Sequence, residues 1–145
     1  MPIKVLLVED SQGDLRLTQE AFRGANNSIQ LLVACDGAEA MAFLKHEGTY
    51  VHAPRPDIIL LDLNLPKMDG RRVLAFIKAD EALKAIPTVI LTTSQAEEDI
   101  VKSYELNANC YLTKPVQYYE FENLVKSIND FWLTNVKLPE QRQAN

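Results

Sequence analysis

Residues 55–70, RPDIILLDLNLPKMDG, place an acidic residue directly after a short apolar run. The run at 58–61 is continuous and contains only Ile and Leu, which is typical of a strand buried on both faces of a parallel sheet. Asp62 follows it, and Pro66 with the pair Asp69-Gly70 predicts a loop beyond. Ligands of open α/β sheets bind just past the carboxyl ends of the strands, so Asp62 is positioned for chemistry. Taken alone, it is equally compatible with an Asp that only caps a turn.

Strand patterns of this kind alternate with helical patterns along the whole chain. The predicted strands are residues 3–8, 29–35, 58–61, 88–91 and 109–113. Helices are predicted after Ser11, after Asp36, after Gly70, after Ser94 and from Glu120. Five strands alternating with five helices predict an α/β fold, a doubly wound parallel sheet with helices on both faces and right-handed crossovers.

Local signals set the expected ends and faces of the helices. Ser11 with Asp14, and Ser94 with Glu97, have the spacing of capping boxes. Gly48 is expected to end the second helix, and residues 48–56, with two prolines and no periodicity, to form a surface loop. The expected inner face of the fourth helix is Ile100, Val101 and Tyr104. The fifth helix has the clearest apolar stripe, which consists of Phe121, Leu124, Val125, Ile128 and Trp132.

Length and charge limit the classes of function. A chain of 145 residues and 16.4 kDa predicts one domain, here residues 1–135, followed by a short C-terminal tail at 136–145. A net charge of −5 and a pI near 5.0 argue against nucleic-acid binding and suit a divalent cation. The chain shows neither a membrane-spanning run nor a signal peptide, which predicts a cytosolic protein with no membrane partner.

The cysteines and histidines do not form a metal-ligand pattern. Cys35 and Cys110 have no CxxC spacing, and we expect them to be small buried residues, reduced in the cytosol. His46 and His52 share no ligand spacing with them and are expected to be solvated.

Polar residues stand at the carboxyl ends of four predicted strands. They are Glu9 and Asp10, Asp62, Thr92, and Lys114. Because these ends share one edge of a parallel sheet, the side chains can converge although they are distant in sequence. Clustered carboxylates repel unless a cation offsets them, and Mg²⁺ is the natural cation for such oxygen ligands. A carboxylate beside Mg²⁺ and a lysine can also accept a phosphoryl group.

The same residues resemble the receiver domain of two-component response regulators. The resemblance rests on Glu9-Asp10, on Asp62 followed by NLPKMDG, on Thr92, on Tyr111, and on the pair Lys114-Pro115. It extends over the whole chain and implies the strand order 2-1-3-4-5.

The resemblance also implies a role for each of these residues. Asp62 would accept a phosphoryl group from a phosphohistidine of a histidine kinase, and Lys114 would bind it. Mg²⁺ would be held by Glu9, Asp10, Asp62 and the carbonyl group of Asn64. Thr92 and Tyr111 would form the switch, and the peptide bond before Pro115 would be cis. The protein would catalyse only its own aspartyl phosphorylation and dephosphorylation.

Finer detail resembles the stand-alone response regulators encoded with cyanobacterial phytochrome-type histidine kinases. It lies in the runs LLDLNLPKMDGR, LTTS, NCYLTKP and FWLTNVKLP. This likeness implies a phytochrome-type kinase partner, a role in light signalling, no output domain and a homodimer. A fifth helix that continues through Phe131 and Leu133 carries more apolar surface than one buried stripe uses, so we expect a dimer contact near these residues, Tyr104 and Tyr111.

Other interpretations remain open at this stage. Taken singly, Lys114 could be a surface lysine, Thr92 a strand terminator and Tyr111 a core residue. A flavodoxin-like nucleotide binder would need a Gly- or Ser/Thr-rich loop where Glu9-Asp10 stands. An aspartyl phosphatase would need a second acid where Asn64 stands. The remaining alternative is a degenerate receiver that acts as a docking module independent of phosphorylation.

Overall fold

The computed structural model describes residues 3–25, 29–65, 68–92, 100, 102, 104–114 and 118–130. Its strands are β1 (Ile3–Val8), β2 (Ile29–Ala34), β3 (Ile58–Leu61), β4 (Thr88–Thr92) and β5 (Cys110–Thr113). They form one parallel sheet in the order β2-β1-β3-β4-β5. This confirms the predicted doubly wound architecture and strand order, and the strand boundaries differ from the prediction by at most one residue.

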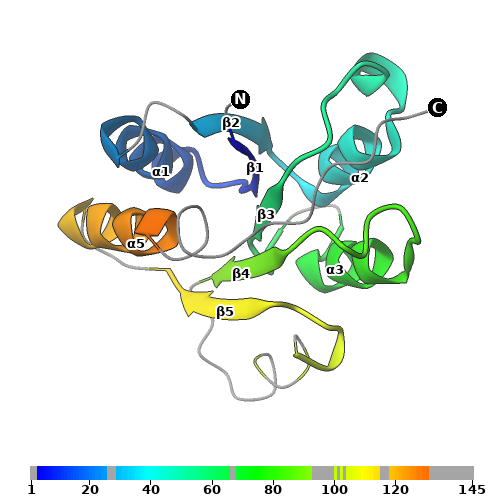
Figure 1. Ribbon diagram of the computed structural model, residues 1–145. Helices are drawn as coiled ribbons and strands as arrows, with labels where there is room; N and C mark the ends of the chain where they lie inside the picture. The colour runs from blue at the N-terminus through cyan, green and yellow to red at the C-terminus, as the bar shows by residue number, and fades with distance from the viewer. Residues whose placement is uncertain are drawn as a thin grey trace.

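Helices cover both faces of the sheet. They are α1 (Gln12–Ala25), α2 (Gly37–Lys45), α3 (Gly70–Ala79) and α5 (Tyr118–Asp130). Helices α1 and α5 lie side by side on one face, and α2 and α3 lie on the other (Figure 1). Of the expected fourth helix, the structure describes only residues 100, 102, 104 and 105, so its extent lies outside the described residues.

Strand β3 is buried on both faces, as its apolar run predicts. Ile58 and Leu60 pack in the hydrophobic cluster under α1 and α5. Ile59 and Leu61 pack in the cluster under α2 and α3. Successive side chains of a strand point to opposite faces, so one short strand contributes to both cores. The sheet is therefore anchored at its centre, where the strand that ends at Asp62 lies.

Local sequence signals predict the start of α1 correctly and the end of α2 incorrectly. The Asp14 backbone N–H donates to Ser11 Oγ at 3.3 Å, which confirms the hydroxyl cap at the start of α1. The expectation that Gly48 ends α2 is wrong, because the helix ends at Lys45 and His46 adopts a left-handed conformation (φ 58°). The Glu47 N–H then donates to the Ala42 carbonyl at 2.9 Å, so a Schellman-type cap forms without glycine. Gly48 instead begins a short 3₁₀ turn, Gly48–Tyr50, in the predicted loop.

Two expectations about burial need correction. Tyr104, expected on the inner face of the fourth helix, is 49% exposed. A tyrosine ring can be partly covered while its hydroxyl group stays in water, so helical spacing alone does not fix its burial. Cys35 and Cys110 are half-buried free thiols rather than fully buried residues. His46 and His52 are exposed, as expected. In the part of the chain that the structure describes, no helix is long and apolar enough to cross a membrane.

Gly70 joins the loop after β3 to helix α3. The pair Asp69-Gly70, predicted as part of the loop, begins the helix, and the Asp69 carboxylate accepts the Arg71 backbone N–H at 2.7 Å. The Gly70 N–H donates to the Leu63 carbonyl at 3.0 Å. A Cβ atom added at Gly70 would lie 2.3 Å from the Asp62 carbonyl oxygen. This contact involves backbone, so it cannot be relieved by a side-chain rotation, and the start of α3 fixes the backbone at Asp62.

We expect Gly70→Ala to destabilise the protein, because its methyl group would push the backbone of Asp62 and Leu63 apart from α3. Overpacking of this kind costs roughly 1–3 kcal/mol in free energy of unfolding. Gly24→Ala is the matched control, since an added Cβ there has nothing within 4 Å and alanine favours the helix. Urea unfolding of both variants measures the difference. Equal stabilities would contradict the proposed close approach.

Candidate functional site

The sheet aligns the residues that follow its strands. The Asp62 N–H donates to the Val8 carbonyl at 3.1 Å, and the Lys114 N–H donates to the Thr92 carbonyl at 2.7 Å. The Glu9 N–H donates to the Ala34 carbonyl at 3.0 Å. The ladder of parallel hydrogen bonds therefore continues one residue past the strands. This brings Glu9, Asp62 and Lys114 together, as predicted from the strand ends.

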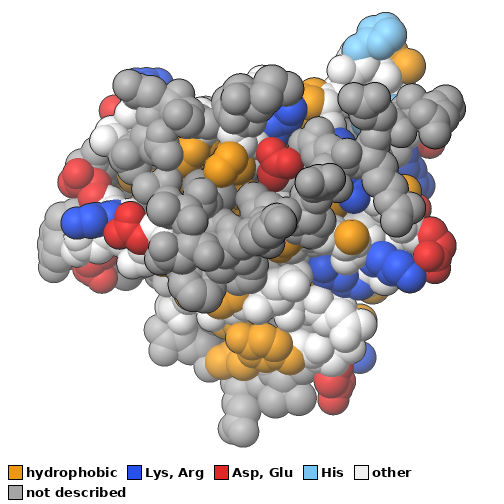
Figure 2. Space-filling view, viewed as in Figure 1, with side chains coloured by type: hydrophobic (Ala, Val, Ile, Leu, Met, Phe, Trp, Pro, Cys, Tyr) orange, Lys and Arg blue, Asp and Glu red, His pale blue; other side chains and the backbone are white. Residues whose placement is uncertain are grey.

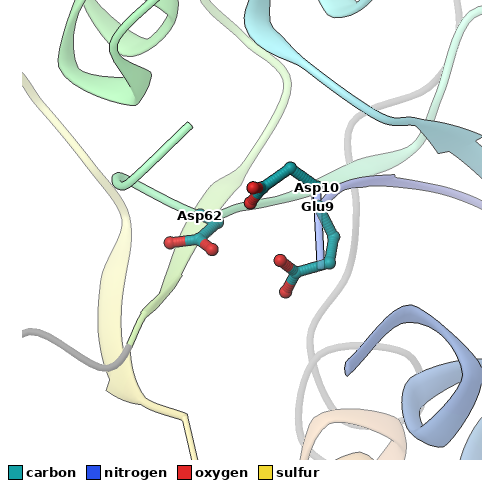
Figure 3. A group of neighbouring side chains, drawn as sticks. All are labelled: Glu9, Asp10 and Asp62. Atoms are coloured by element: carbon teal, nitrogen blue, oxygen red, sulfur yellow. The ribbon is translucent and has the colours of Figure 1, made fainter. Parts of the chain in front are cut away.

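Three carboxylates form a compact acidic cluster between the ends of β1 and β3 (Figure 3). We define this acidic cluster as Glu9, Asp10 and Asp62, each of which offers a carboxylate oxygen within 4.8 Å of those of the other two. Glu9 and Asp62 are buried at 2% and 6% exposure, whereas Asp10 is exposed. Hard oxygen ligands at this spacing, open to solvent on one side, suit a divalent cation that keeps some of its water.

Lys114 is the cation that the buried carboxylates contact. Its Nζ lies 2.5 Å from Glu9 Oε1, 3.1 Å from Asp62 Oδ2 and 3.0 Å from Asp14 Oδ2. Only 4% of its side chain is exposed. An ammonium group has three N–H donors, so these three contacts use all of them. Lys114 is thus neither a surface lysine nor an isolated buried charge.

Burial and charge shift the ionisation of this pair. Burial raises the pKa of Glu9 to about 7, and the hydrogen bond and charge of Lys114 act in the opposite direction. Burial by itself would lower the pKa of Lys114, but the hydrogen bond to Glu9 and the charges of Asp62 and Glu9 outweigh it and raise that pKa. The lysine therefore stays charged. A cation bound beside Glu9 would lower the pKa of this carboxyl group again.

Backbone groups orient both buried carboxylates. The Asn64 N–H donates to Asp62 Oδ1 at 3.1 Å, while Oδ2 faces Lys114. The Ser11 N–H donates to Glu9 Oε2 at 3.2 Å, while Oε1 faces the same lysine. Each carboxylate is thus held from both sides, and Asp62 keeps a fixed orientation at the end of β3.

Thr92 and Tyr111 are neighbours on one face of the sheet. Tyr111 is paired in register with Ile90, and both belong to the cluster under α2 and α3. Thr92 lies two residues beyond Ile90 and therefore points to the same face. Thr92 is fully buried, and its Oγ1 accepts the Asn64 side-chain amide at 3.4 Å. The predicted switch residues are thus adjacent to each other and to the loop after Asp62.

One residue of the site, Asp14, was not predicted from the sequence. Three of the predicted residues cannot be compared with the structure. Asp14 was interpreted only as part of a helix cap, yet its carboxylate contacts Lys114. A signal was present, because an acid in the first turn of a helix that follows β1 lies at the same sheet edge as the strand ends. Pro115 with its predicted cis bond, Phe131 and Leu133 lie outside the described residues.

Comparisons with known proteins identify the class. The sequence model of the response regulator receiver domain matches residues 5–129, so the chain belongs to this family. Response regulator Rcp1 from Synechocystis sp. is 51% identical over 138 residues, which is 95% of this chain and 94% of Rcp1.

Two solved structures from cyanobacterial relatives extend this finding. The crystal structure of the Mn²⁺-bound form of Rcp1 matches with a TM-score of 0.91 and 51% identity, over 96% of this chain and 100% of the chain in that structure. The phosphorylated cyanobacterial phytochrome response regulator RcpA matches with a TM-score of 0.93 and 50% identity, over 97% and 100% of the two chains. The chain is therefore a receiver-domain response regulator homologous to Rcp1 and RcpA.

We expect Lys114→Met to destabilise the protein strongly when divalent cations are chelated. The buried carboxylates of Glu9 and Asp62 would lose their cation, and breaking a buried pair in this way costs roughly 3–5 kcal/mol. Adding Glu9→Gln should restore part of the loss, since one of the uncompensated charges disappears. Urea unfolding in the presence of a chelator measures these differences.

Lys84→Met is the control, because Lys84 is 51% exposed and pairs with Glu81 at the surface. Such pairs contribute about 0–1 kcal/mol. If Lys114→Met cost no more than Lys84→Met, the stabilising role of the buried ammonium group would be refuted.

Proposed function

We propose that this protein accepts a phosphoryl group from a histidine kinase on Asp62. The observation that carries the proposal is the position of the Lys114 ammonium, 3.1 Å from Asp62 Oδ2 and beside the acidic cluster. Phosphoryl transfer depends mainly on positioning and charge neutralisation, which this arrangement offers. The occurrence of all these groups at one sheet edge favours a phosphoacceptor over a degenerate docking module.

The proposed reaction is a simple displacement at phosphorus. A carboxylate oxygen of Asp62 attacks the phosphorus of phosphohistidine and forms the new P–O bond. The P–N bond breaks, and the imidazole leaves with its electron pair and takes up a proton. Lys114 donates a hydrogen bond to a phosphoryl oxygen and offsets its charge. The Asn64 N–H keeps the other oxygen of Asp62 in place, which holds the attacking group in orientation.

The acidic cluster fits a divalent cation, and we propose Mg²⁺. Glu9, Asp10, Asp62 and the carbonyl group of Asn64 would hold it, and the fit rests on the carboxylate oxygens within 4.8 Å of one another. Bound there, Mg²⁺ supplies positive charge against the phosphoryl oxygens. The Mn²⁺-bound form of Rcp1 supports a divalent cation in a related receiver domain.

The proposed partner is a phytochrome-type histidine kinase, and the proposed pathway is light signalling. Support comes from RcpA, a cyanobacterial phytochrome response regulator that is 50% identical. Such a reaction would take place in the cytoplasm, where the ATP that charges the kinase is found.

Phosphoryl oxygens held by Lys114 would draw the Thr92 hydroxyl group toward them. Tyr111, its neighbour on the sheet face, would then turn inward and change the surface around β5.

Intact-mass analysis after incubation with acetyl phosphate and Mg²⁺ tests the phosphoacceptor. We expect one added phosphoryl group on the wild-type protein, none when Mg²⁺ is chelated, and slower addition in Asp10→Asn. Asp62→Asn should gain no phosphoryl mass, because an amide is not a nucleophile. Asp69→Asn is the matched control, since asparagine also caps a helix and the residue lies near the same loop. Phosphoryl addition to Asp62→Asn at the wild-type rate would show that Asp62 is not the acceptor.

We also propose a homodimer whose contact includes Tyr104, Tyr111, Phe131 and Leu133. Tyr104 is 49% exposed, and Figure 2 shows a hydrophobic patch in the region of β5 and the segment before it. Sedimentation at micromolar concentration should show a dimer that Tyr104→Asp weakens toward monomer. Val51→Asp is the control, because Val51 is a comparably exposed apolar residue (57%) in the turn after α2. A monomeric wild-type protein, with and without phosphoryl on Asp62, would contradict the dimer.

A further inference from the structure

Asp14 contacts the lysine of the site from helix α1. Its Oδ2 lies 3.0 Å from Lys114 Nζ, although the two residues are 100 positions apart in the sequence. The Asp14 side chain is 31% exposed and Lys114 is 4% exposed, so one partner lies at the mouth of the site and the other inside it. Asp14 is not part of the acidic cluster that could hold a metal ion.

Two hydrogen bonds hold the main chain of Asp14, which restricts the positions that its side chain can reach. The Asp14 N–H donates to Ser11 Oγ at 3.3 Å, and the Asp14 carbonyl accepts the Thr18 hydroxyl at 2.8 Å. Asp14 also lies in the first turn of α1, where the helix dipole stabilises a negative charge. The position of this backbone keeps the Asp14 carboxylate close to Lys114.

This contact competes with the reaction proposed for the site. Glu9, Asp14 and Asp62 together occupy the three N–H donors of Lys114. A phosphoryl oxygen can be bound by the ammonium group only when one of these carboxylates gives up its place. Asp14 also adds a negative charge near the position that an anionic phosphoryl donor must approach, which opposes that approach.

We propose that Asp14 is a positioning residue that restrains Lys114 and thereby slows phosphoryl transfer to Asp62. This inference rests on the proposed phosphoacceptor function. In the resting protein, Asp14 holds the ammonium group on the α1 side of the site. During transfer, a phosphoryl oxygen replaces the Asp14 carboxylate on one N–H of Lys114. The charge of Asp14 thus sets how readily a donor captures the lysine.

The test compares Asp14→Asn with Asp14→Glu and the wild-type protein. Rates of phosphoryl addition are measured by intact mass over a range of acetyl phosphate concentrations, with Mg²⁺ saturating. We expect Asp14→Asn to raise the rate constant per donor concentration about fivefold, the ratio for an ion pair worth ~1 kcal/mol. Asp14→Glu keeps the carboxylate and should return the rate toward the wild-type value.

Beryllofluoride, a non-reacting phosphoryl analogue, supplies a readout that does not depend on turnover. Its affinity for the Mg²⁺-bound protein should rise by a similar factor in Asp14→Asn, because Lys114 is freer to bind an anion. Mg²⁺ affinity, measured by calorimetry, should stay the same or fall slightly, since a nearby negative charge is removed. An unchanged beryllofluoride affinity in Asp14→Asn would overturn the inference.

Glu20→Gln is the matched control for net charge. Glu20 lies on the same helix, is exposed, and pairs with Arg23 rather than with Lys114. We expect its phosphorylation rate to match that of the wild-type protein. An equal gain in Glu20→Gln would show a general charge effect and overturn the role of the Asp14 contact.

Two further outcomes separate the inference from the function on which it rests. If the wild-type protein gains phosphoryl on Asp62 but Asp14→Asn is equally fast or slower, the inference is overturned and the proposed function stands. If the wild-type protein gains none from acetyl phosphate or from a phosphorylated kinase, both are overturned.

Discussion

The site depends on one buried ammonium group. Lys114 contacts Glu9, Asp14 and Asp62 within 3.1 Å, in surroundings where its side chain is 4% exposed. Without this cation, the carboxylates at the ends of β1 and β3 would repel one another in a poorly solvated space. The same charge that lets these acids pack together also suits the phosphoryl transfer that we propose at Asp62, so stability and the proposed function depend on one interaction.

The parallel sheet makes this interaction possible. Main-chain hydrogen bonds continue from Asp62 to Val8 and from Lys114 to Thr92, one residue past the strands. The sheet therefore sets the positions of the side chains that follow it, with little freedom left to the loops. Gly70 adds a second restraint, because the start of α3 approaches the Asp62 backbone too closely for any Cβ atom. Rigid main chain on both sides of Asp62 explains how a residue at a strand end keeps its orientation.

Local patterns predicted much of this arrangement, and their failures have physical causes. The strand at Ile58–Leu61 was predicted correctly because buried parallel strands have a distinctive composition. The residues at the strand ends were predicted to lie together because parallel strands end at one edge of the sheet. The end of α2 was misplaced, since His46 adopts the left-handed conformation usually given to glycine. The exposure of Tyr104 was misjudged, because helical spacing does not report how much of a ring the neighbouring elements cover.

The sequence by itself determined the alternation of strands and helices, the class of fold and the candidate residues of the acidic cluster. These follow from hydrophobic periodicity and from the rule that parallel strands end at one edge. Only the tertiary structure decided which charges share a partner. Asp14 and Lys114 are 100 residues apart, and their 3.0 Å contact depends on the tertiary placement of α1, which packs against α5, relative to the residue that follows β5. Local propensity favours an acid in the first turn of a helix. Tertiary packing determines that this acid contacts a lysine rather than water.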